Sequence, residues 1–372
     1  MEDRLSVHAS NRWRTWSIIL LAICFVAFYF MNAQAVAQGV RNGLTVCATI
    51  LIPSLFPFMI VCSFLVNSRY IDALSMPLSS FTVRVLRLPP FMGAVFILSL
   101  IGGFPVGARM ISDMYREGRV DVHTASRMLC FCVNAGPAFL ITAVGSRMFG
   151  NTTAGVFLFC SQTFASIALA LFSRLWTKKQ EHTTHAPIRL NPFVPSFVSA
   201  VRNAADSMFS VCAFVTAFSA VVAFVDSSRF ADLLHKLISF APAGTTEAAI
   251  NGLFEVTLGC SKSPVIGGLF SLYFACIICS FGGLSVMGQA LSFFSGLPIK
   301  TLPYLLSRLV HMILSCGILF VLTKLFPAAV TVFSPAVGSI TSQPFSGAPA
   351  ASFALLILCF ALILTKDEHA NI

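Results

Sequence analysis

The chain has 372 residues, of which 57% are hydrophobic and only 10% are charged. Soluble domains carry about 25% charged residues, so this composition excludes a water-soluble protein and indicates one that faces lipid. The formal net charge of +10 does not indicate nucleic-acid binding. Its Lys and Arg residues are scattered through loops between apolar runs, as in membrane proteins.

The apolar runs define a set of predicted membrane spans, because a spanning helix needs about 20 apolar residues. The first run follows three arginines but is too long for a signal peptide, so we interpret it as an uncleaved helix. The polar segment 176–196 divides the chain into two halves, and the Pro-, Ser- and Gly-rich segment 327–346 is interpreted as an external loop. The predicted spans are 16–37, 43–66, 127–149, 152–175, 206–228, 270–294, 303–326 and 347–364.

Two further apolar segments are too short to span the membrane. Phe91–Ile101 and Ala248–Leu258 have eleven residues each, and Gly/Pro-rich turns follow them at Gly102–Gly107 and Gly259–Pro264. Eleven helical residues rise roughly 16 Å, about half of the ~30 Å hydrocarbon core. This pattern predicts two re-entrant helical hairpins with tips at the Gly/Pro segments, and a pair of kinked ordinary spans is the alternative.

An interrupted helix follows each predicted hairpin. The interruptions are Cys132–Pro137, where Pro137 removes a backbone donor, and Ser280–Ser285, which contains two adjacent glycines. The two halves also begin with similar sequences, at Val40–Gly43 and Val201–Ala204. Interrupted segments at corresponding places in two halves of a membrane protein indicate a transporter site.

The distribution of positive charge predicts the orientation. With the N-terminus inside and each hairpin returning to its own side, eighteen of the 24 Lys and Arg residues face the cytoplasm, as the positive-inside rule requires. The two halves are then inverted, with the first hairpin entering from the cytoplasm and the second from the exterior. The predicted fold is therefore an all-α polytopic membrane protein with an inverted repeat, two opposed re-entrant hairpins, broken helices and both termini cytoplasmic.

These boundaries divide the chain into five predicted units. The N-terminal tail and first helix take residues 1–38, and the first repeat takes 39–175. The cytoplasmic linker is 176–200, the second, inverted repeat is 201–326, and the outer loop with the last helix is 327–372.

Polar residues at membrane depth are costly and usually functional. Glu255 lies in the first arm of the second hairpin, Lys262 at its predicted tip, and Asn134 at the first break. These groups either bind an ion or a small polar solute, or satisfy one another and the broken backbone, with Glu255 paired to Lys262. The candidate site residues are Asn134, Gly103, Pro105, Gly136, Glu255, Thr257, Ser261, Ser285 and Gln289.

Other polar residues and the cysteines receive a structural interpretation. Arg202 with Asp206 is predicted to be a local pair near the cytoplasmic end of a span, and Arg308 with His311 is read similarly. The twelve cysteines lack nearby histidines at zinc spacing, so no metal site and no cofactor are predicted. The sequence has no HExxH, P-loop, GxSxG or kinase-type motif, which predicts that the protein is not an enzyme.

Five motifs in this order resemble the sporulation integral membrane proteins of the YlbJ type, which carry nucleoside-recognition (Gate) domains. The motifs are Leu51–Phe58 (LIPSLFPF), Gly102–Ala108 (GGFPVGA), Asn134–Phe139 (NAGPAF), Gly252–Gly259 (GLFEVTLG) and Ser280–Val286 (SFGGLSV). The resemblance implies a role in spore development in a Gram-positive bacterium. It also implies a core similar to that of concentrative nucleoside transporters, which use opposed re-entrant hairpins.

Two functions are consistent with these observations. The first is a secondary transporter or permease for an unidentified small polar solute, in the cell membrane of a sporulating cell. The alternative is a non-transporting membrane scaffold for a sporulation partner complex. A transporter needs Glu255, Asn134 and the glycine-rich breaks, whereas a scaffold depends on loops such as 176–196. The expected partners are the lipid bilayer, a solute or coupling ion, and a second copy or a sporulation membrane protein, but no nucleic acid.

Overall fold

The computed structural model of the chain describes residues 30–67, 70–176, 193–227 and 244–327, together with single residues 16, 19, 20, 236 and 242. Every regular element in these ranges is a helix, which confirms an all-α polytopic membrane protein. The predicted span 347–364, half of span 16–37, and residues 328–346 lie outside the described residues. Five described helices are long and apolar enough to cross a membrane: Ala33–Val66, α9 (Thr152–Ser173), α10 (Phe193–Asp226), Gly268–Ser292 and α16 (Thr301–Leu325).

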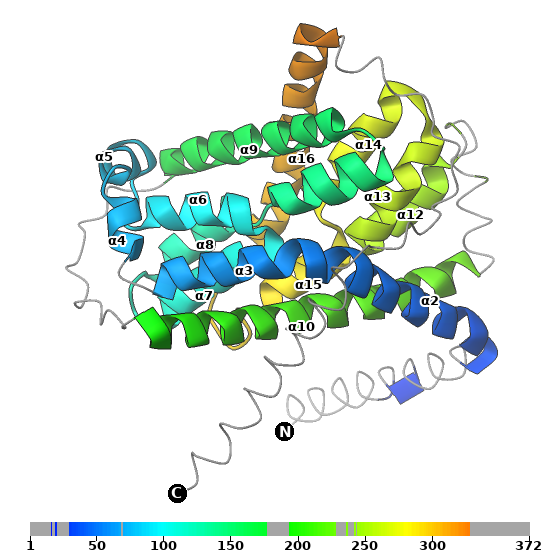
Figure 1. The fold of residues 1–372 in the computed structure, drawn as a ribbon, viewed down its shortest axis with the longest axis horizontal. Coiled ribbons are helices and arrows are strands. Elements are labelled where there is room, and N and C mark those ends of the chain that lie inside the picture. The colour runs from blue at the N-terminus through cyan, green and yellow to red at the C-terminus, as the bar shows by residue number, and fades with distance from the viewer. Residues whose placement is uncertain are drawn as a thin grey trace, which may run out of the picture.

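The first long helix runs without a loop through α2 (Ala33–Val46), η1 (Cys47–Leu51) and α3 (Ile52–Asn67) (Figure 1). The predicted boundary between spans 16–37 and 43–66 is therefore wrong, because the intervening residues are helical. Pro53 has no N–H to donate to the carbonyl four residues back. Arg147 Nη1 donates to that carbonyl, of Thr49, at 3.0 Å, which satisfies the acceptor that the proline leaves.

The helix α10 packs along α2 and α3 (Figure 1). Small residues allow this approach: a Cβ added at Gly39 would lie 2.6 Å from the carbonyl oxygen of Ser219. The helix begins at Phe193, well before the predicted start of the span at residue 206, so the predicted linker 176–200 ends inside it. Arg109 ties α10 to the first hairpin, with Nη2 3.5 Å from Asp206 Oδ2 and 3.0 Å from Asn203 Oδ1.

The first hairpin consists of α6 (Met92–Gly102) and α7 (Phe104–Arg116). Its turn is Gly103, at φ 85° and ψ −175°, a conformation that only glycine adopts without strain. The turn therefore lies in the Gly/Pro segment where the sequence predicts it. A Cβ added at Gly107 would lie 1.9 Å from the carbonyl oxygen of Cys132, so the arm α7 packs directly on the end of α8 (Val122–Cys132).

The second hairpin consists of α12 (Thr245–Phe254) and α13 (Val256–Lys262), which pack against each other. Its turn is Glu255, in an extended conformation with φ −141° and ψ 121°. The predicted tip at Gly259–Pro264 is therefore wrong, because those residues form the second arm and the start of η5 (Ser263–Ile266).

The position of the turn at Glu255 also determines which carboxylate pairs with Lys262. This lysine lies at the far end of α13 from Glu255, and its Nζ is 2.6 Å from Glu247 Oε1 on α12. The predicted pair between Glu255 and Lys262 is therefore wrong. The ion pair joins the two arms at the base of the hairpin, where both side chains are partly exposed.

Each hairpin is followed by a broken helix. The segment 133–137 separates α8 from η3 (Ala138–Met148), so the predicted span 127–149 is two short helices. Gly282, at φ 87°, separates α14 (Gly268–Phe281) from α15 (Gly283–Ser292). The order of long helix, hairpin, broken helix and span occurs twice, and the two closing spans α9 and α16 pack together.

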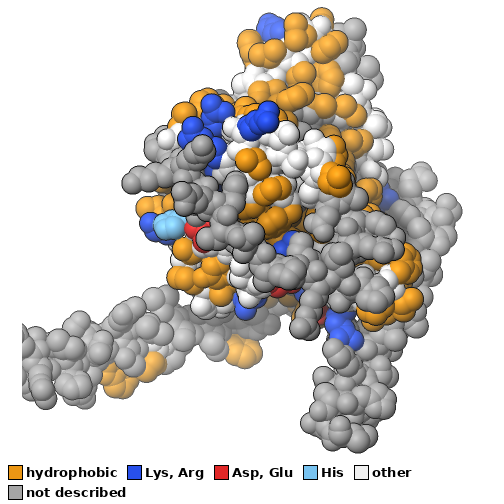
Figure 2. All heavy atoms as spheres, turned by 90° about the vertical axis from the view of Figure 1, so that its left-hand side faces the viewer, with side chains coloured by type: hydrophobic (Ala, Val, Ile, Leu, Met, Phe, Trp, Pro, Cys, Tyr) orange, Lys and Arg blue, Asp and Glu red, His pale blue; other side chains and the backbone are white. Residues whose placement is uncertain are grey.

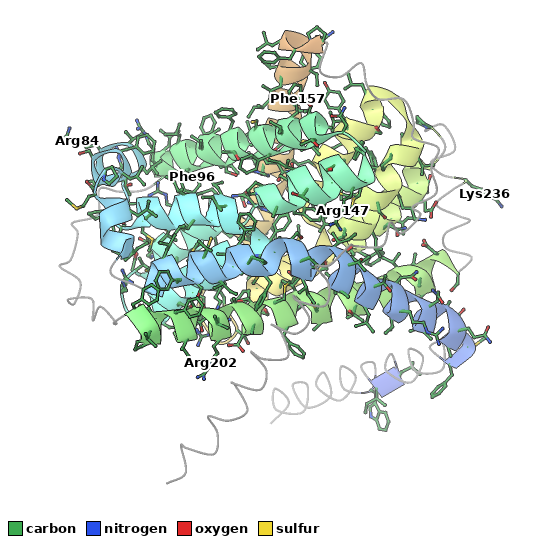
Figure 3. All side chains as sticks on the ribbon, viewed as in Figure 1. Arg84, Phe96, Arg147, Phe157, Arg202 and Lys236 are labelled. Atoms are coloured by element: carbon green, nitrogen blue, oxygen red, sulfur yellow. The ribbon has the colours of Figure 1, made fainter. Side chains whose placement is uncertain are left out.

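Short helices connect the first long helix to the first hairpin. They are α4 (Tyr70–Ser75), α5 (Ser79–Phe81) and η2 (Thr82–Leu86), and η4 (Arg174–Trp176) extends α9 at the same end. Figure 3 shows Arg84 and Arg202 toward this end of the long helices and Arg147 and Lys236 toward the other. The two basic residues predicted to be cytoplasmic thus lie toward one end of the molecule and the two predicted to be external toward the other. Which end faces the cytoplasm stays a prediction.

Candidate functional site

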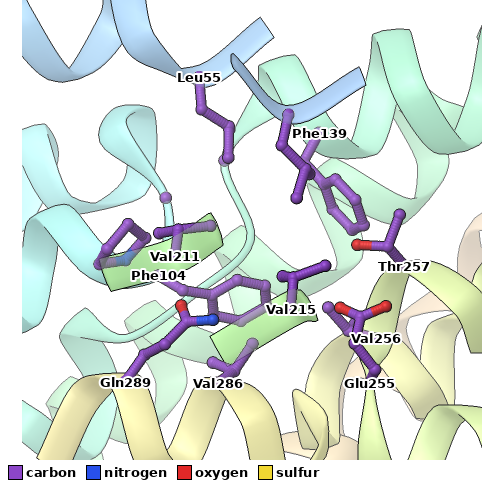
Figure 4. Close-up of a pocket in the computed structure, with 14 residues that line it drawn as sticks. Leu55, Phe104, Phe139, Val211, Val215, Glu255, Val256, Thr257, Val286 and Gln289 are labelled. Carbon is purple, nitrogen blue, oxygen red and sulfur yellow. The ribbon is translucent and has the colours of Figure 1, made fainter. Parts of the chain in front are cut away.

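The tips of both hairpins and both broken helices line one partly open cavity (Figure 4). The space that the centre of a water molecule can occupy is about 30 Å³. A water needs about 10–15 Å³ of such space, so the cavity has room for a few waters or a small ion in this conformation. Its walls are Leu51, Leu55, Gly103, Phe104, Pro105, Gly136, Phe139, Val211, Val215, Glu255, Val256, Thr257, Val286 and Gln289.

Glu255 supplies the charge of this cavity. Among the described residues that line it, Glu255 alone has an ionisable side chain, and it is 0% exposed. Its Oε2 accepts a hydrogen bond from the backbone N–H of Leu258 at 2.7 Å, so the carboxylate caps the N-terminus of α13. Its Oε1 has no hydrogen-bond partner among the described residues. A buried carboxylate oxygen without a donor is costly, and it is the group to which a ligand cation or N–H or O–H donor would bind.

Neutral polar groups stand beside the carboxylate. Figure 4 shows Thr257 and Gln289 extending from the second half of the chain toward the same space as Glu255, between apolar side chains that include Phe104 and Val215. A hydroxyl and a carboxamide each donate and accept hydrogen bonds. Together with Glu255 they can hold a small polar species inside an otherwise apolar wall.

The helices α6 and α12 end at the hairpin tips that line the cavity, and four other helices begin there. These four are α7, η3, α13 and α15, and residues of their first turns line the space. Free N–H groups and the positive end of the helix dipole favour negative charge at such a point. The N-terminus of α13 stabilises the carboxylate of Glu255, which accepts the Leu258 N–H.

The structure brings six of the nine predicted site residues to the cavity wall: Gly103, Pro105, Gly136, Glu255, Thr257 and Gln289. Asn134, Ser261 and Ser285 are not among the lining residues. Asn134 instead uses its Nδ2 to donate to the carbonyl of Phe131 at 2.6 Å, within the first break. Ser261 donates to the carbonyl of Leu258 at 2.7 Å, and Ser285 is buried without a hydrogen-bond partner among the described residues.

Close backbone packing explains why glycine occupies the first hairpin turn and the first break. A Cβ at Gly136 would lie 2.7 Å from the carbonyl oxygen of Ile101 and 3.0 Å from the backbone nitrogen of Gly103. The second break repeats this contact, because a Cβ at Gly283 would lie 2.9 Å from the carbonyl oxygen of Gly252. Each hairpin therefore packs, backbone against backbone, on the broken helix that follows it.

Sequence reasoning missed the apolar wall that the two long helices contribute. Leu51 and Leu55 come from the first long helix, and Val211 and Val215 come from α10. Both pairs have the spacing i, i+4, which places them on one helix face. The same spacing of apolar residues in the long helix of each half is the sequence signal that could have predicted these four residues.

Sequence reasoning also missed the partners of Arg308. This residue was predicted to lie near the inner interface with His311 on one helix face; it is 1% exposed and is the largest fully buried side chain described. Its Nη1 donates to the carbonyl of Val133, and its Nη2 donates to the carbonyl of Cys130 at 2.6 Å. Arg308 thus satisfies free carbonyls at the C-terminal end of α8, where a helix dipole favours positive charge.

His311, one turn further along α16, is buried as well. Its Nε2 lies 3.0 Å from Ser166 Oγ and 3.2 Å from the carbonyl oxygen of Gln162, both on α9. The predicted local relation between Arg308 and His311 is therefore replaced by contacts to different partners. Arg308 binds the first break, and His311 joins the two closing spans.

Comparison with known proteins gives one curated relative that bears on identity. Sporulation integral membrane protein YlbJ of Bacillus subtilis (strain 168) is 22% identical over 337 residues, which cover 82% of this chain and 83% of that protein. This chain is similar to a YlbJ-type sporulation integral membrane protein. The resemblance that the motifs indicated is confirmed. Together with the apolar helices, it makes the chain a multi-pass membrane protein.

The other two comparisons give no match. No family model matches the chain, so the nucleoside-recognition (Gate) domain that the YlbJ resemblance implies stays a prediction. No solved structure matches it. The similarity to YlbJ therefore supports the membrane class and the family resemblance, and the cavity carries the argument about chemistry.

Proposed function

We propose that the chain is a secondary transporter or permease for a small polar solute, active during sporulation, with its site at the cavity between the hairpin tips. The observation that carries this proposal is the buried Oε1 of Glu255, which has no hydrogen-bond partner among the described residues and belongs to a cavity lined by both hairpins. The similarity to YlbJ supports the sporulation context.

The size of the cavity bears on the mechanism. The described conformation has room for a small ion or a few waters, whereas most polar solutes are larger. Binding of such a solute requires the hairpin tips to separate from each other or from the long helices that supply Leu55 and Val211. Glycine contacts between Gly103 and Gly136 have no interlocking side chains, which makes this boundary suited to such a movement.

The experiment replaces one carboxylate and compares it with another on the same hairpin. Glu255→Gln keeps an amide oxygen that can accept from Leu258 N–H, so the cap of α13 survives while the charge is lost. Glu247→Gln makes the same chemical change on α12, at a partly exposed ion pair. We expect Glu255→Gln to abolish complementation of a deletion strain in sporulation at wild-type protein abundance, whereas Glu247→Gln complements.

A metabolite comparison completes this test. Forespores that contain Glu255→Gln should show the same altered solute content as forespores without the protein. Wild-type sporulation with well-expressed Glu255→Gln would overturn the transporter proposal. It would favour the alternative of a scaffold, which tolerates neutral replacements in the cavity and depends on the segment 176–196.

A further inference from the structure

Three arginines from separate parts of the first half converge on the C-terminal end of η2. Arg127, from α8, donates through Nη2 to the carbonyl of Leu86 and through Nη1 to that of Arg87 at 3.1 Å. Arg174, from the end of α9, donates to the carbonyl of Val85 at 3.2 Å. Arg87, at φ 53°, donates to the carbonyl of Arg174 at 3.5 Å. The carbonyls at a helix end orient these side chains but carry no full negative charge.

Arg127 and Arg174 therefore carry positive charge that no described carboxylate neutralises. Arg84 lies in the last turn of the same short helix η2, three residues before Arg87, and is exposed. Within the described residues, the salt bridges involve Arg109, Arg119 and Lys262 as cations, so Arg84, Arg127 and Arg174 have no carboxylate at ion-pair distance. Guanidinium groups gathered without carboxylates form a site for a phosphate or another oxyanion, which they bind through paired N–H donors.

Exposed apolar side chains border the arginines. Phe81 precedes η2 and is 45% exposed, and Phe172 and Leu175, on either side of Arg174, are 51% and 67% exposed. Figure 2 views this end of the molecule and shows Lys and Arg side chains close together beside hydrophobic ones. An apolar surface next to a cluster of positive charge matches the two parts of a phospholipid, the acyl chains and the headgroup phosphate.

We propose that the arginine cluster binds the phosphodiester headgroup of an anionic phospholipid, whose acyl chains lie along Phe81, Phe172 and Leu175. A soluble phosphate would use the guanidinium groups but would leave the apolar border without a role. The cluster lies at the end of the molecule that the charge distribution predicts to be cytoplasmic, and anionic lipids give that leaflet its negative surface potential.

The test measures thermal unfolding of the full chain in detergent, with phosphatidylglycerol or phosphatidylcholine added. Phosphatidylglycerol should raise the midpoint of the wild type by about 4 °C, because a ligand that binds the folded state stabilises it. The double variant Arg84→Gln/Arg174→Gln should lose most of this shift. Arg84→Lys/Arg174→Lys keeps the charge and should retain a large part of it, and Arg41→Gln/Lys324→Gln, at exposed cations elsewhere, should retain all of it.

Two further measurements keep the proposal falsifiable. Arg84→Gln alone removes an exposed side chain, so it should fold normally and still reduce the shift. Glycerol phosphate, which lacks acyl chains, should produce no shift, and the lipid effect should weaken as salt screens the charges. The proposal is overturned by an equal shift with glycerol phosphate or phosphatidylcholine, or by an unchanged shift in the Arg84→Gln/Arg174→Gln variant.

Discussion

The two hairpins have the same shape but differ in chemistry. Each has two short helices, a turn of one residue, and a glycine four positions after the turn, Gly107 in the first and Gly259 in the second. The first turn is Gly103, which has no side chain, and the second is Glu255, which supplies the carboxylate of the cavity. Backbone geometry is therefore duplicated between the halves, whereas the ionisable group is present in one half alone among the described tips.

The two glycines also make different contacts. A Cβ at Gly107 would meet the carbonyl oxygen of Cys132, on the broken helix that follows. A Cβ at Gly259 would lie 2.3 Å from Cα of Gly252, on the other arm of its own hairpin. Gly107 thus joins the first hairpin to the helix that follows, whereas Gly259 joins the two arms of the second hairpin. Both hairpins also contact the broken helix that follows them, at Gly136 in the first half and at Gly283 in the second.

The largest expected effect tests whether the hairpins enter from opposite sides. In a background without native cysteines, Glu117→Cys reports the base of the first hairpin and Val265→Cys reports the base of the second. Both positions are exposed. A membrane-impermeant maleimide added to intact cells should label Val265→Cys fully and Glu117→Cys only after lysis. Labelling of both positions from the same side would remove the opposed arrangement and the inverted repeat with it.

The next effect concerns the glycines that close the hairpins. Gly107→Ala and Gly259→Ala should each lower the free energy of unfolding by more than about 4 kcal/mol, because the added methyl group meets backbone atoms that cannot move aside. Protein abundance and the unfolding midpoint in detergent measure the loss. Gly317→Ala is the matched control, since nothing lies within 4 Å of its Cβ position on α16. A stable Gly259→Ala variant would show that the arms of the second hairpin are less closely packed than described.

The smallest effect concerns the base of the second hairpin. Both side chains of the Glu247–Lys262 pair are more than one third exposed, so a double-mutant cycle of Glu247→Gln and Lys262→Met should give a coupling of about 0–1 kcal/mol. Thermal unfolding of the four proteins measures it. The cycle of Lys262→Met with Glu255→Gln should give no coupling. A coupling with Glu255 larger than that with Glu247 would restore the pairing across the turn that the structure replaces.

The sequence predicted the hairpins and breaks where glycine and proline mark them. Gly103, Pro137 and Gly282 are positions at which the backbone needs positive φ or loses a donor, and these requirements are visible in the chain itself. The second turn escaped prediction because Glu255 makes it in an ordinary extended conformation, which any residue adopts. The nearby Gly259–Pro264 segment has stronger turn residues but lies in helices.

The candidate site was predicted in part for a related reason. Glu255, Thr257 and Gln289 stand out as polar residues in apolar segments, and they meet at the cavity. Ser261 and Ser285 have the same composition signal, but their helix positions turn them away from the lining. Arg308 could not be placed from its position near the start of a span, because its partners at Cys130 and Val133 are distant in sequence.

The contact of Arg308 has a consequence for the order in which the chain is made. The residue follows Val133 by 175 positions, so a ribosome finishes the first broken helix long before the guanidinium that satisfies it exists. During that interval the carbonyls of Cys130 and Val133 lack their final donor in a membrane environment. We expect water to donate to these carbonyls until α16 is inserted. The last described helix, α16, thus supplies hydrogen bonds to the first half as well as the second. A chain truncated before α16 would lack the Arg308 hydrogen bonds at the first break.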